Sequence, residues 1–166
     1  MGVEVSDFNF TIDLPVRSEW SDVDLLRQSV QNCFSVVFRD LEGCQTLSMV
    51  TGELLENAVK YGNWSASESG FRLRVWGEEH VARVSVQSPT RPDDPGAKEL
   101  LRRLAWIKAF PSAESAYKAR LLEVAAANDG GASSGLGLVR IAYEGNCRLD
   151  ATIQDGVLSV VATMPL

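Results

Sequence analysis

The chain has 166 residues, of which 45% are hydrophobic and 23% charged, as expected for a soluble globular protein that can bury a core. Its formal net charge of -6 argues against a nucleic-acid partner, because a nucleic-acid binder needs a basic face to neutralise phosphates. The single histidine, His80, argues against a histidine triad and against a multi-histidine metal site.

The cysteines, the N-terminal residues and the hydropathy of the sequence indicate where in the cell the protein is expected. Cys33, Cys44 and Cys147 are odd in number and far apart, so neither a disulfide framework nor a zinc site is indicated. Residues 1–13 lack the basic and apolar blocks of a signal peptide. No stretch approaches the run of about 20 apolar residues that spans a bilayer. We therefore expect a cytoplasmic protein with no membrane partner.

The first half of the chain predicts a strand, two helices and a pair of strands. Residues 8–14 alternate apolar and polar side chains, which is typical of a half-buried strand. A helix capped by Ser21 or Asp22 is expected to run to about residue 40 and to be broken by Gly43. The next expected elements are a helix over about 46–61 and strands over 71–76 and 81–87.

The second half predicts two loops, three helices and a hairpin. Residues 88–96 contain three prolines and 128–134 are rich in glycine and serine, so both are expected to be loops. The final hairpin is expected to turn at Asp155-Gly156. Helices are predicted over 97–110, 112–127 and 136–143, and the hairpin strands over 148–153 and 157–164. This order of elements indicates an α+β, two-layer pattern.

One predicted helix carries a stripe of polar side chains of the kinds that bind a metal ion or accept a proton. Glu53 and Asn57 are four residues apart and share a face, which Lys60 and Tyr61 extend. Magnesium prefers oxygen ligands and retains waters, so an amide oxygen and phosphates can hold it, while a carboxylate one turn away can deprotonate a hydroxyl. The alternative is a solvated surface stripe with an ordinary Glu56–Lys60 pair.

A second motif follows the loop at 128–134. Gly135 and Gly137 allow the backbone to approach a ligand closely, and the free N–H groups of a helix start attract phosphate. The alternative is a glycine-containing loop that leads into a buried helix and binds no ligand.

The run Glu-Leu-Leu-Glu-Asn-Ala-Val-Lys-Tyr at 53–61 resembles the N-box of the GHKL superfamily, which includes sensor histidine kinases, anti-sigma-factor serine kinases, and gyrase-type and Hsp90-type ATPases. The resemblance implies an ATP and Mg²⁺ site. In it Glu53 takes the catalytic-base position, Asn57 holds magnesium, and Lys60 lies near phosphate. Tyr61 is included with the nucleotide-binding residues.

The run at 135–138 resembles the G2 box of the same superfamily, whose first glycine would fall at Ser133. This resemblance assigns four residues to the nucleotide site: Gly135, Leu136, Gly137 and Leu138. An apolar slot for the purine is expected from Leu54, Val84, Val86 and Leu138.

The G1 box of the superfamily, whose aspartate accepts a hydrogen bond from the adenine amino group, is missing. Gln87 or Ser88 occupies the aligned position, and the Gln87 amide would be a weaker acceptor for adenine. Asp93 and Asp94 offer a displaced alternative, although two prolines constrain their loop differently.

The strand at 8–14, the long helix and the N-box-like helix together resemble the compact anti-sigma-factor serine kinases. The resemblance implies one GHKL-type ATP-binding domain over 1–166, with a helical insertion at about 97–127 in place of the ATP lid. The implied histidine-kinase-like fold is a two-layer α/β sandwich, with a mixed, mostly antiparallel sheet and helices on one face.

The function implied is that of an ATP-dependent serine/threonine kinase which phosphorylates a small STAS-type antagonist protein, or of a regulator that sequesters a sigma factor. A homodimer is compatible with the family. The alternative is a degenerate, non-catalytic domain that switches partners. The set Glu53, Asn57 and Lys60 favours the kinase, whereas the missing G1 aspartate favours weak nucleotide binding or the alternative.

Overall fold

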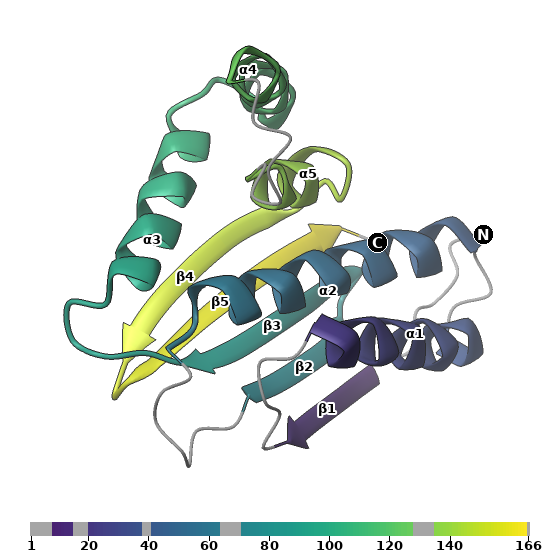
Figure 1. The fold of residues 1–166 in the computed structure, drawn as a ribbon. Coiled ribbons are helices and arrows are strands. Elements are labelled where there is room, and N and C mark those ends of the chain that lie inside the picture. The colour runs from purple at the N-terminus through teal and green to yellow at the C-terminus, as the bar shows by residue number, and fades with distance from the viewer. Residues whose placement is uncertain (1–7, 15–19, 38–40, 64–70, 128–134, 166) are drawn as a thin grey trace.

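The computed structural model describes residues 8–14, 20–37, 41–63, 71–127 and 135–165. It confirms the α+β two-layer fold (Figure 1). The elements, in chain order, are β1 Phe8–Leu14, α1 Trp20–Val37, α2 Leu41–Tyr61, β2 Phe71–Glu78, β3 Val81–Pro89, α3 Pro95–Lys108, α4 Ala113–Ala126, α5 Gly137–Tyr143, β4 Arg148–Gln154 and β5 Val157–Pro165.

The strands form one sheet in the order β1-β2-β3-β5-β4, and its four pairings are all antiparallel. The parallel component of the expected mixed sheet is therefore not found among the described strands. Alternation along each strand gives the sheet one apolar face. On β3 this face carries Val84 and Val86, which pair in register with Val75 and Leu73 on β2.

Helices α1 and α2 lie side by side over the apolar face (Figure 1). On α1 the predicted stripe is buried at Val23, Val30 and Phe34. Helix α2 begins at Leu41, earlier than predicted, and Gly43 lies in its first turn instead of breaking the chain. The local cost of a glycine in a helix is only about 1 kcal/mol, which the burial of the α2 face outweighs.

The segment between β3 and α5 forms a pair of helices, as expected from the sequence. Helix α3 starts at Pro95 and is capped by Asp94, whose carboxylate accepts from the Ala97 backbone N–H at 3.0 Å. Helix α4 is capped by Ser112, which exchanges hydrogen bonds with Ser115 in a capping box.

Each helix of this pair carries an aromatic contact. The rings of Trp106 and Phe110 meet edge to face at 4.6 Å between centroids. Tyr117 of α4 packs on Tyr143 of α5 at 5.2 Å between ring centroids and donates to the Glu144 carboxylate. These aromatic residues therefore pack within the helical layer.

Two tight turns fix the hairpins. Glu79 and His80 both have positive φ between β2 and β3, as do Asp155 and Gly156 between β4 and β5, and this conformation matches the twist of the flanking strands. In the described part of the chain, no helix has the length and apolar character needed to cross a membrane.

Candidate functional site

The two motifs of the sequence meet in space, although they lie on different helices. Glu53 and Asn57 are on α2, and Gly137 opens α5 beside them. A β-carbon built on Gly137 would lie 2.6 Å from Glu53 Oε2 and 3.8 Å from Asn57 Nδ2. Only a residue without a side chain fits there without displacing the Glu53 carboxylate, so Gly137 lets the backbone of α5 approach the acid and the amide.

Arg140, which the sequence did not single out, completes this arrangement. It lies one turn beyond Gly137 on α5, and its Nη1 donates to Glu53 Oε1 at 2.9 Å. Its Nε donates to Glu144 at 2.8 Å on the same helix. The Glu53 side chain is 17% exposed and that of Arg140 is 45% exposed, so the ion pair lies at the edge of solvent.

Asn57 is half-buried, and its Nδ2 atom is buried without a hydrogen-bond partner among the described residues. Buried amide groups in proteins are nearly always hydrogen-bonded, so an unsatisfied one calls for an explanation. The Asn57 amide is not held by a structural hydrogen bond through this nitrogen. The unpaired atom is a donor that a ligand oxygen would satisfy, whereas a metal would take the amide oxygen.

Lys60 and Tyr61 end the α2 helix. The Lys60 ammonium lies 5.1 Å from the centre of the Tyr61 ring. Burial, followed by the charges of Arg103 and Arg120, lowers the pKa of Lys60. Tyr61 is buried, and this burial raises the pKa of its hydroxyl. The two arginines belong to α3 and α4, so the helical pair extends the charged surface of α2.

The G2-like residues divide between surface and core. Gly135 has φ +61, a conformation that favours glycine, and it is half-buried with Leu136. Leu138 is buried in the core beneath α5. Ser133, the expected position of the first glycine of the motif, lies outside the described residues.

The predicted adenine reader Gln87 lies away from these groups. In β3 it pairs in register with Arg72 and Ser159, whereas the adjacent Val86 and Ser88 point to the helical face. The structure therefore does not bring Gln87 to Glu53 and Asn57. Ser88 lies on the face of the sheet that the helices cover. Its side chain is a neutral hydroxyl, not a carboxylate, and the residue is only 3% exposed.

Asp93 and Asp94 have structural partners. Asp94 Oδ2 accepts from the Ala97 N–H and its Oδ1 accepts from Asn63 Nδ2 at 3.1 Å, so both oxygens are used in the α3 cap. Asp93 is exposed and pairs with Lys98 at 2.9 Å. Neither carboxylate is placed as a spare acceptor for adenine.

The expected purine slot is closed in this structure. Leu54, Val84, Val86 and Leu138 are each no more than 3% exposed and belong to the main core cluster. Leu100 and Leu104 of α3 belong to the same cluster. A purine would therefore have to displace apolar side chains, including those of α3.

A polar groove opens beside Glu53. It has a volume of about 240 Å³ and runs between α1 and α2, with Glu53, Glu56, Arg27 and Arg140 in its walls. Burial and the neighbouring Glu53 carboxylate raise the pKa of Glu56. Glu53 therefore packs against the backbone at Gly137 and also lies in the wall of this groove.

Among solved structures, the chain is similar to a chain in the crystal structure of the SiaB–SiaC complex from Pseudomonas aeruginosa. The TM-score is 0.65 at 17% sequence identity, over 95% of this chain and 89% of that chain. No protein-family model and no curated protein matches the sequence. At this identity the similarity shows a related fold, while the activity has to be argued from the residues.

Proposed function

We propose that the protein is an ATP-binding regulator that resembles the anti-sigma-factor serine kinases and transfers phosphate from Mg-ATP to a small STAS-type partner protein. The observation that carries this proposal is the meeting of Glu53, Asn57 and Gly137, which come from two separate motifs. If the stripe on α2 were only a solvated surface, no glycine of another helix would be needed next to Glu53 and Asn57.

Each residue has a defined part in this proposal. Asn57 would offer its amide oxygen to magnesium, with the remaining ligands from phosphates and water, since Mg²⁺ usually retains waters. Bound Mg-ATP would supply the phosphoryl group and the charge stabilisation of the metal. Glu53 would accept the proton of the acceptor hydroxyl, and Lys60 would face the phosphates.

The polar groove between α1 and α2 is the route we propose for the acceptor. Glu53 lies in its wall, so a hydroxyl-bearing side chain of the partner that enters the groove would meet this carboxylate. Arg140 Nη1 holds Oε1 at 2.9 Å, so Oε2 would be the oxygen that accepts the proton while this ion pair stays in place.

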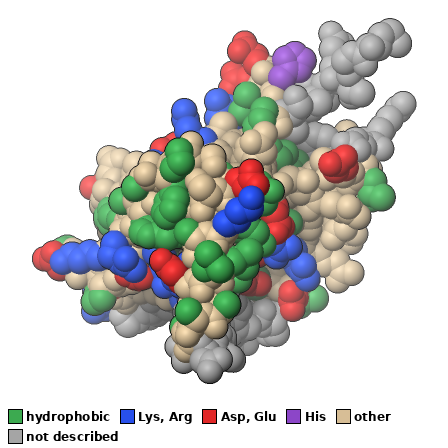
Figure 2. Space-filling model, turned by 90° about the horizontal axis from the view of Figure 1, so that it is seen from above, with side chains coloured by type: hydrophobic (Ala, Val, Ile, Leu, Met, Phe, Trp, Pro, Cys, Tyr) green, Lys and Arg blue, Asp and Glu red, His purple; other side chains and the backbone are tan. Residues whose placement is uncertain are grey.

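A protein partner is supported by two features. The similar structure was solved as a complex of two proteins, SiaB and SiaC. The molecular surface seen from above shows hydrophobic side chains between charged ones (Figure 2). Leu121 and Leu122 of α4 are among the exposed large hydrophobic residues, at 40% and 72% exposure. Such side chains are typical of a surface that a partner covers.

A second candidate function is a non-catalytic domain that switches partners. The closed purine slot favours it, together with the ion pair that occupies Glu53. In this case the groove and α4 would bind partners, and nucleotide turnover would be absent.

A phosphotransfer assay distinguishes the two candidate functions. Labelled ATP and magnesium are incubated with purified STAS-domain proteins and with wild type, Glu53→Gln or the control Glu42→Gln, which changes an exposed acid in the first turn of α2. The kinase proposal predicts transfer that falls by about 10²-fold or more in Glu53→Gln and not in the control. Transfer that is unchanged in Glu53→Gln rejects the assigned base. Mg-ATP binding without transfer to any of these proteins favours the partner-switching domain.

A further inference from the structure

Three side-chain hydrogen bonds connect α4 to the candidate base on α2. Arg140 Nη1 donates to Glu53 Oε1 at 2.9 Å, and Arg140 Nε donates to Glu144 Oε2 at 2.8 Å. The other oxygen of Glu144, Oε1, accepts from the Tyr117 hydroxyl of α4 at 3.2 Å. Glu144 directly follows the last residue of α5. The bonds therefore run from α2 through α5 to α4.

Arg140 binds its two acidic partners through different nitrogens of one guanidinium group. Because that group is planar and rigid, a bond at Nε also restricts the direction in which Nη1 points. The Arg140 side chain is 45% exposed, and a long side chain at an exposed position samples many rotamers unless it is held. Glu144 therefore restricts the position from which Arg140 donates to Glu53.

Tyr117 restricts Glu144 in turn. Its ring packs on Tyr143 at 5.2 Å between centroids, which places the phenol next to the end of α5. Partial desolvation and the hydrogen bond to Glu144 raise the pKa of the Tyr117 hydroxyl, so it stays protonated and can donate at neutral pH. Both oxygens of Glu144 are thus held, one by a residue of α4 and one by Arg140.

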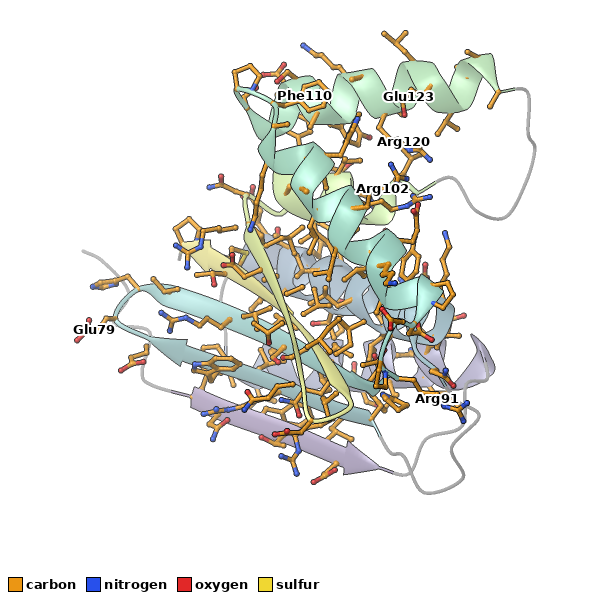
Figure 3. All side chains as sticks on the ribbon, turned by 90° about the vertical axis from the view of Figure 1, so that its left-hand side faces the viewer. Glu79, Arg91, Arg102, Phe110, Arg120 and Glu123 are labelled. Carbon is orange, nitrogen blue, oxygen red and sulfur yellow. The ribbon has the colours of Figure 1, made fainter. Side chains whose placement is uncertain are left out.

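Helix α4, which supplies Tyr117, belongs to the helical pair between β3 and α5. It lies against α5 at the end of the molecule away from β1 (Figure 1 and Figure 3), and Figure 3 labels Arg120 on it. The ion pair of Glu114 and Lys118 stays within α4, as is usual for an exposed helix surface. The Tyr117 hydrogen bond differs, because it leaves the helix and meets the residue that holds Arg140.

We propose that Glu144 and Tyr117 are positioning residues that act through Arg140 and orient the Glu53 carboxylate for proton transfer. The inference rests on the proposed function, in which Glu53 accepts the proton of the acceptor hydroxyl. Neither Glu144 nor Tyr117 belongs to the two motifs that resemble the N-box and the G2 box. The proposal gives α4 a part in the site, although α4 carries no residue of either motif.

A held carboxylate has a defined advantage as a base. Arg140 binds Oε1 of Glu53, which leaves Oε2 to accept the proton. A carboxylate that rotates about its last bond presents its oxygens in many directions, and few of these meet the acceptor hydroxyl at the right distance and angle. A group that must act in a fixed geometry is held by hydrogen bonds from the residues behind it. Tyr117 and Glu144 supply that support for Glu53.

The test compares two variants of the full chain with matched controls. Tyr117→Phe keeps the ring and removes the donor. Its control is Tyr143→Phe, because Tyr143 belongs to the same ring pair and its hydroxyl has no hydrogen bond within the described residues. Glu144→Gln keeps the side-chain length and removes the charge, and its control is Glu114→Gln, whose ion pair stays within α4. Thermal unfolding confirms that each variant folds.

The first readout is the carboxyl carbon resonance of Glu53 in the NMR spectrum, recorded without nucleotide and assigned through its loss in Glu53→Gln. Tyr117→Phe and Glu144→Gln should both shift this resonance, because the Arg140 donor moves when its support is removed. The two control variants should leave the resonance where it is in wild type. A contact that only stabilises α4 and α5 would not move it.

The second readout is the phosphotransfer assay described above. In Tyr117→Phe, kcat should fall by about 3- to 10-fold, the scale of one hydrogen bond, while the KM for Mg-ATP stays the same. The controls should transfer phosphate like wild type. A change confined to KM would contradict the proposal, because it would place the effect in nucleotide binding.

The outcomes separate this inference from the proposed function. If transfer falls in Glu53→Gln but not in Tyr117→Phe and Glu144→Gln, the kinase function stands and the inference is rejected. If no transfer occurs but the Glu53 resonance shifts in both variants, the kinase function is rejected and the orientation of Glu53 by α4 is supported. An unshifted Glu53 resonance in both variants overturns the inference, whatever the kinetics show.

Discussion

Arg140 Nη1 donates to Glu53 Oε1 at 2.9 Å, so a residue of the G2-like helix holds the candidate base of the N-box-like helix. This ion pair joins the two motifs on which the proposed function depends. It also places the carboxylate between Gly137 and the polar groove, where nucleotide and acceptor would meet. The pair is therefore both a structural contact and a constraint on the chemistry of Glu53.

The first prediction concerns the strength of this pair. A double-mutant cycle with Arg140→Gln and Glu53→Gln, measured by denaturant unfolding, should give a coupling free energy of about 0.5–1 kcal/mol. The value is modest because Arg140 is nearly half exposed and solvent screens its charge. A coupling of zero would show that the two side chains do not interact in solution.

The second prediction concerns the close approach at Gly137. Gly137→Ala should weaken nucleotide binding with little loss of stability, because the new methyl group meets the end of the Glu53 side chain at Oε2 and the carboxylate must shift. Gly52→Ala is the control on α2. Its methyl group would meet the flexible Arg27 side chain, which can move aside. If both variants show the same stability and the same nucleotide binding, the packing at Gly137 is not what positions Glu53.

The third prediction separates capping from adenine recognition. Asp94→Ala should lower the free energy of unfolding by about 1 kcal/mol, because it removes the cap of α3 and the partner of Asn63. The ratio of ATP to GTP affinity should stay the same. Asp93→Asn, at an exposed position whose positive φ asparagine tolerates, should change neither quantity. A selective loss of ATP affinity in Asp94→Ala would identify Asp94 as a relocated adenine reader.

The fourth prediction concerns the stability of the protein at low pH. Hydrogen bonds from Arg102 and Arg103 lower the pKa of Glu99 to about 2. Because the folded value lies below the unfolded value of about 4.3, the stabilising effect is present above that pH and is lost as the pH falls toward 2. Wild type should therefore lose more stability than Glu99→Gln between pH 5 and pH 2. The difference should be small, since Glu99 is 34% exposed. Parallel pH profiles of the two proteins would contradict this.

Much of the fold was predictable because its signals are local. Alternation in β1, the long apolar stripe of α1 and the turn at Asp155-Gly156 each report their own conformation, and the structure confirms them. The start of α2 was missed because tertiary packing outweighs the helix propensity of Gly43. The cap of α3 had a readable signal that was not used, since Asp94-Pro95 is the typical start of a helix.

The site was predictable in part for the same reason. Glu53 and Asn57 follow from helical spacing within one motif. The position of Arg140 depends on a contact between separate helices, and the sequence around it holds no signal for that contact. The placement of Gln87 could have been inferred, because strand alternation sets it opposite to the buried Val86.

The most direct test of the central claim is calorimetry of Mg-ATP binding to wild type and to Asn57→Ala, each with and without magnesium. The account predicts weak, magnesium-dependent binding to wild type and its loss in a variant that remains folded, because Asn57 is the protein ligand assigned to the metal. Gln45→Ala, an exposed amide on α2, controls for loss of an amide from this helix. Equal, magnesium-dependent affinity in wild type and Asn57→Ala, or no nucleotide binding by wild type at all, would contradict the account.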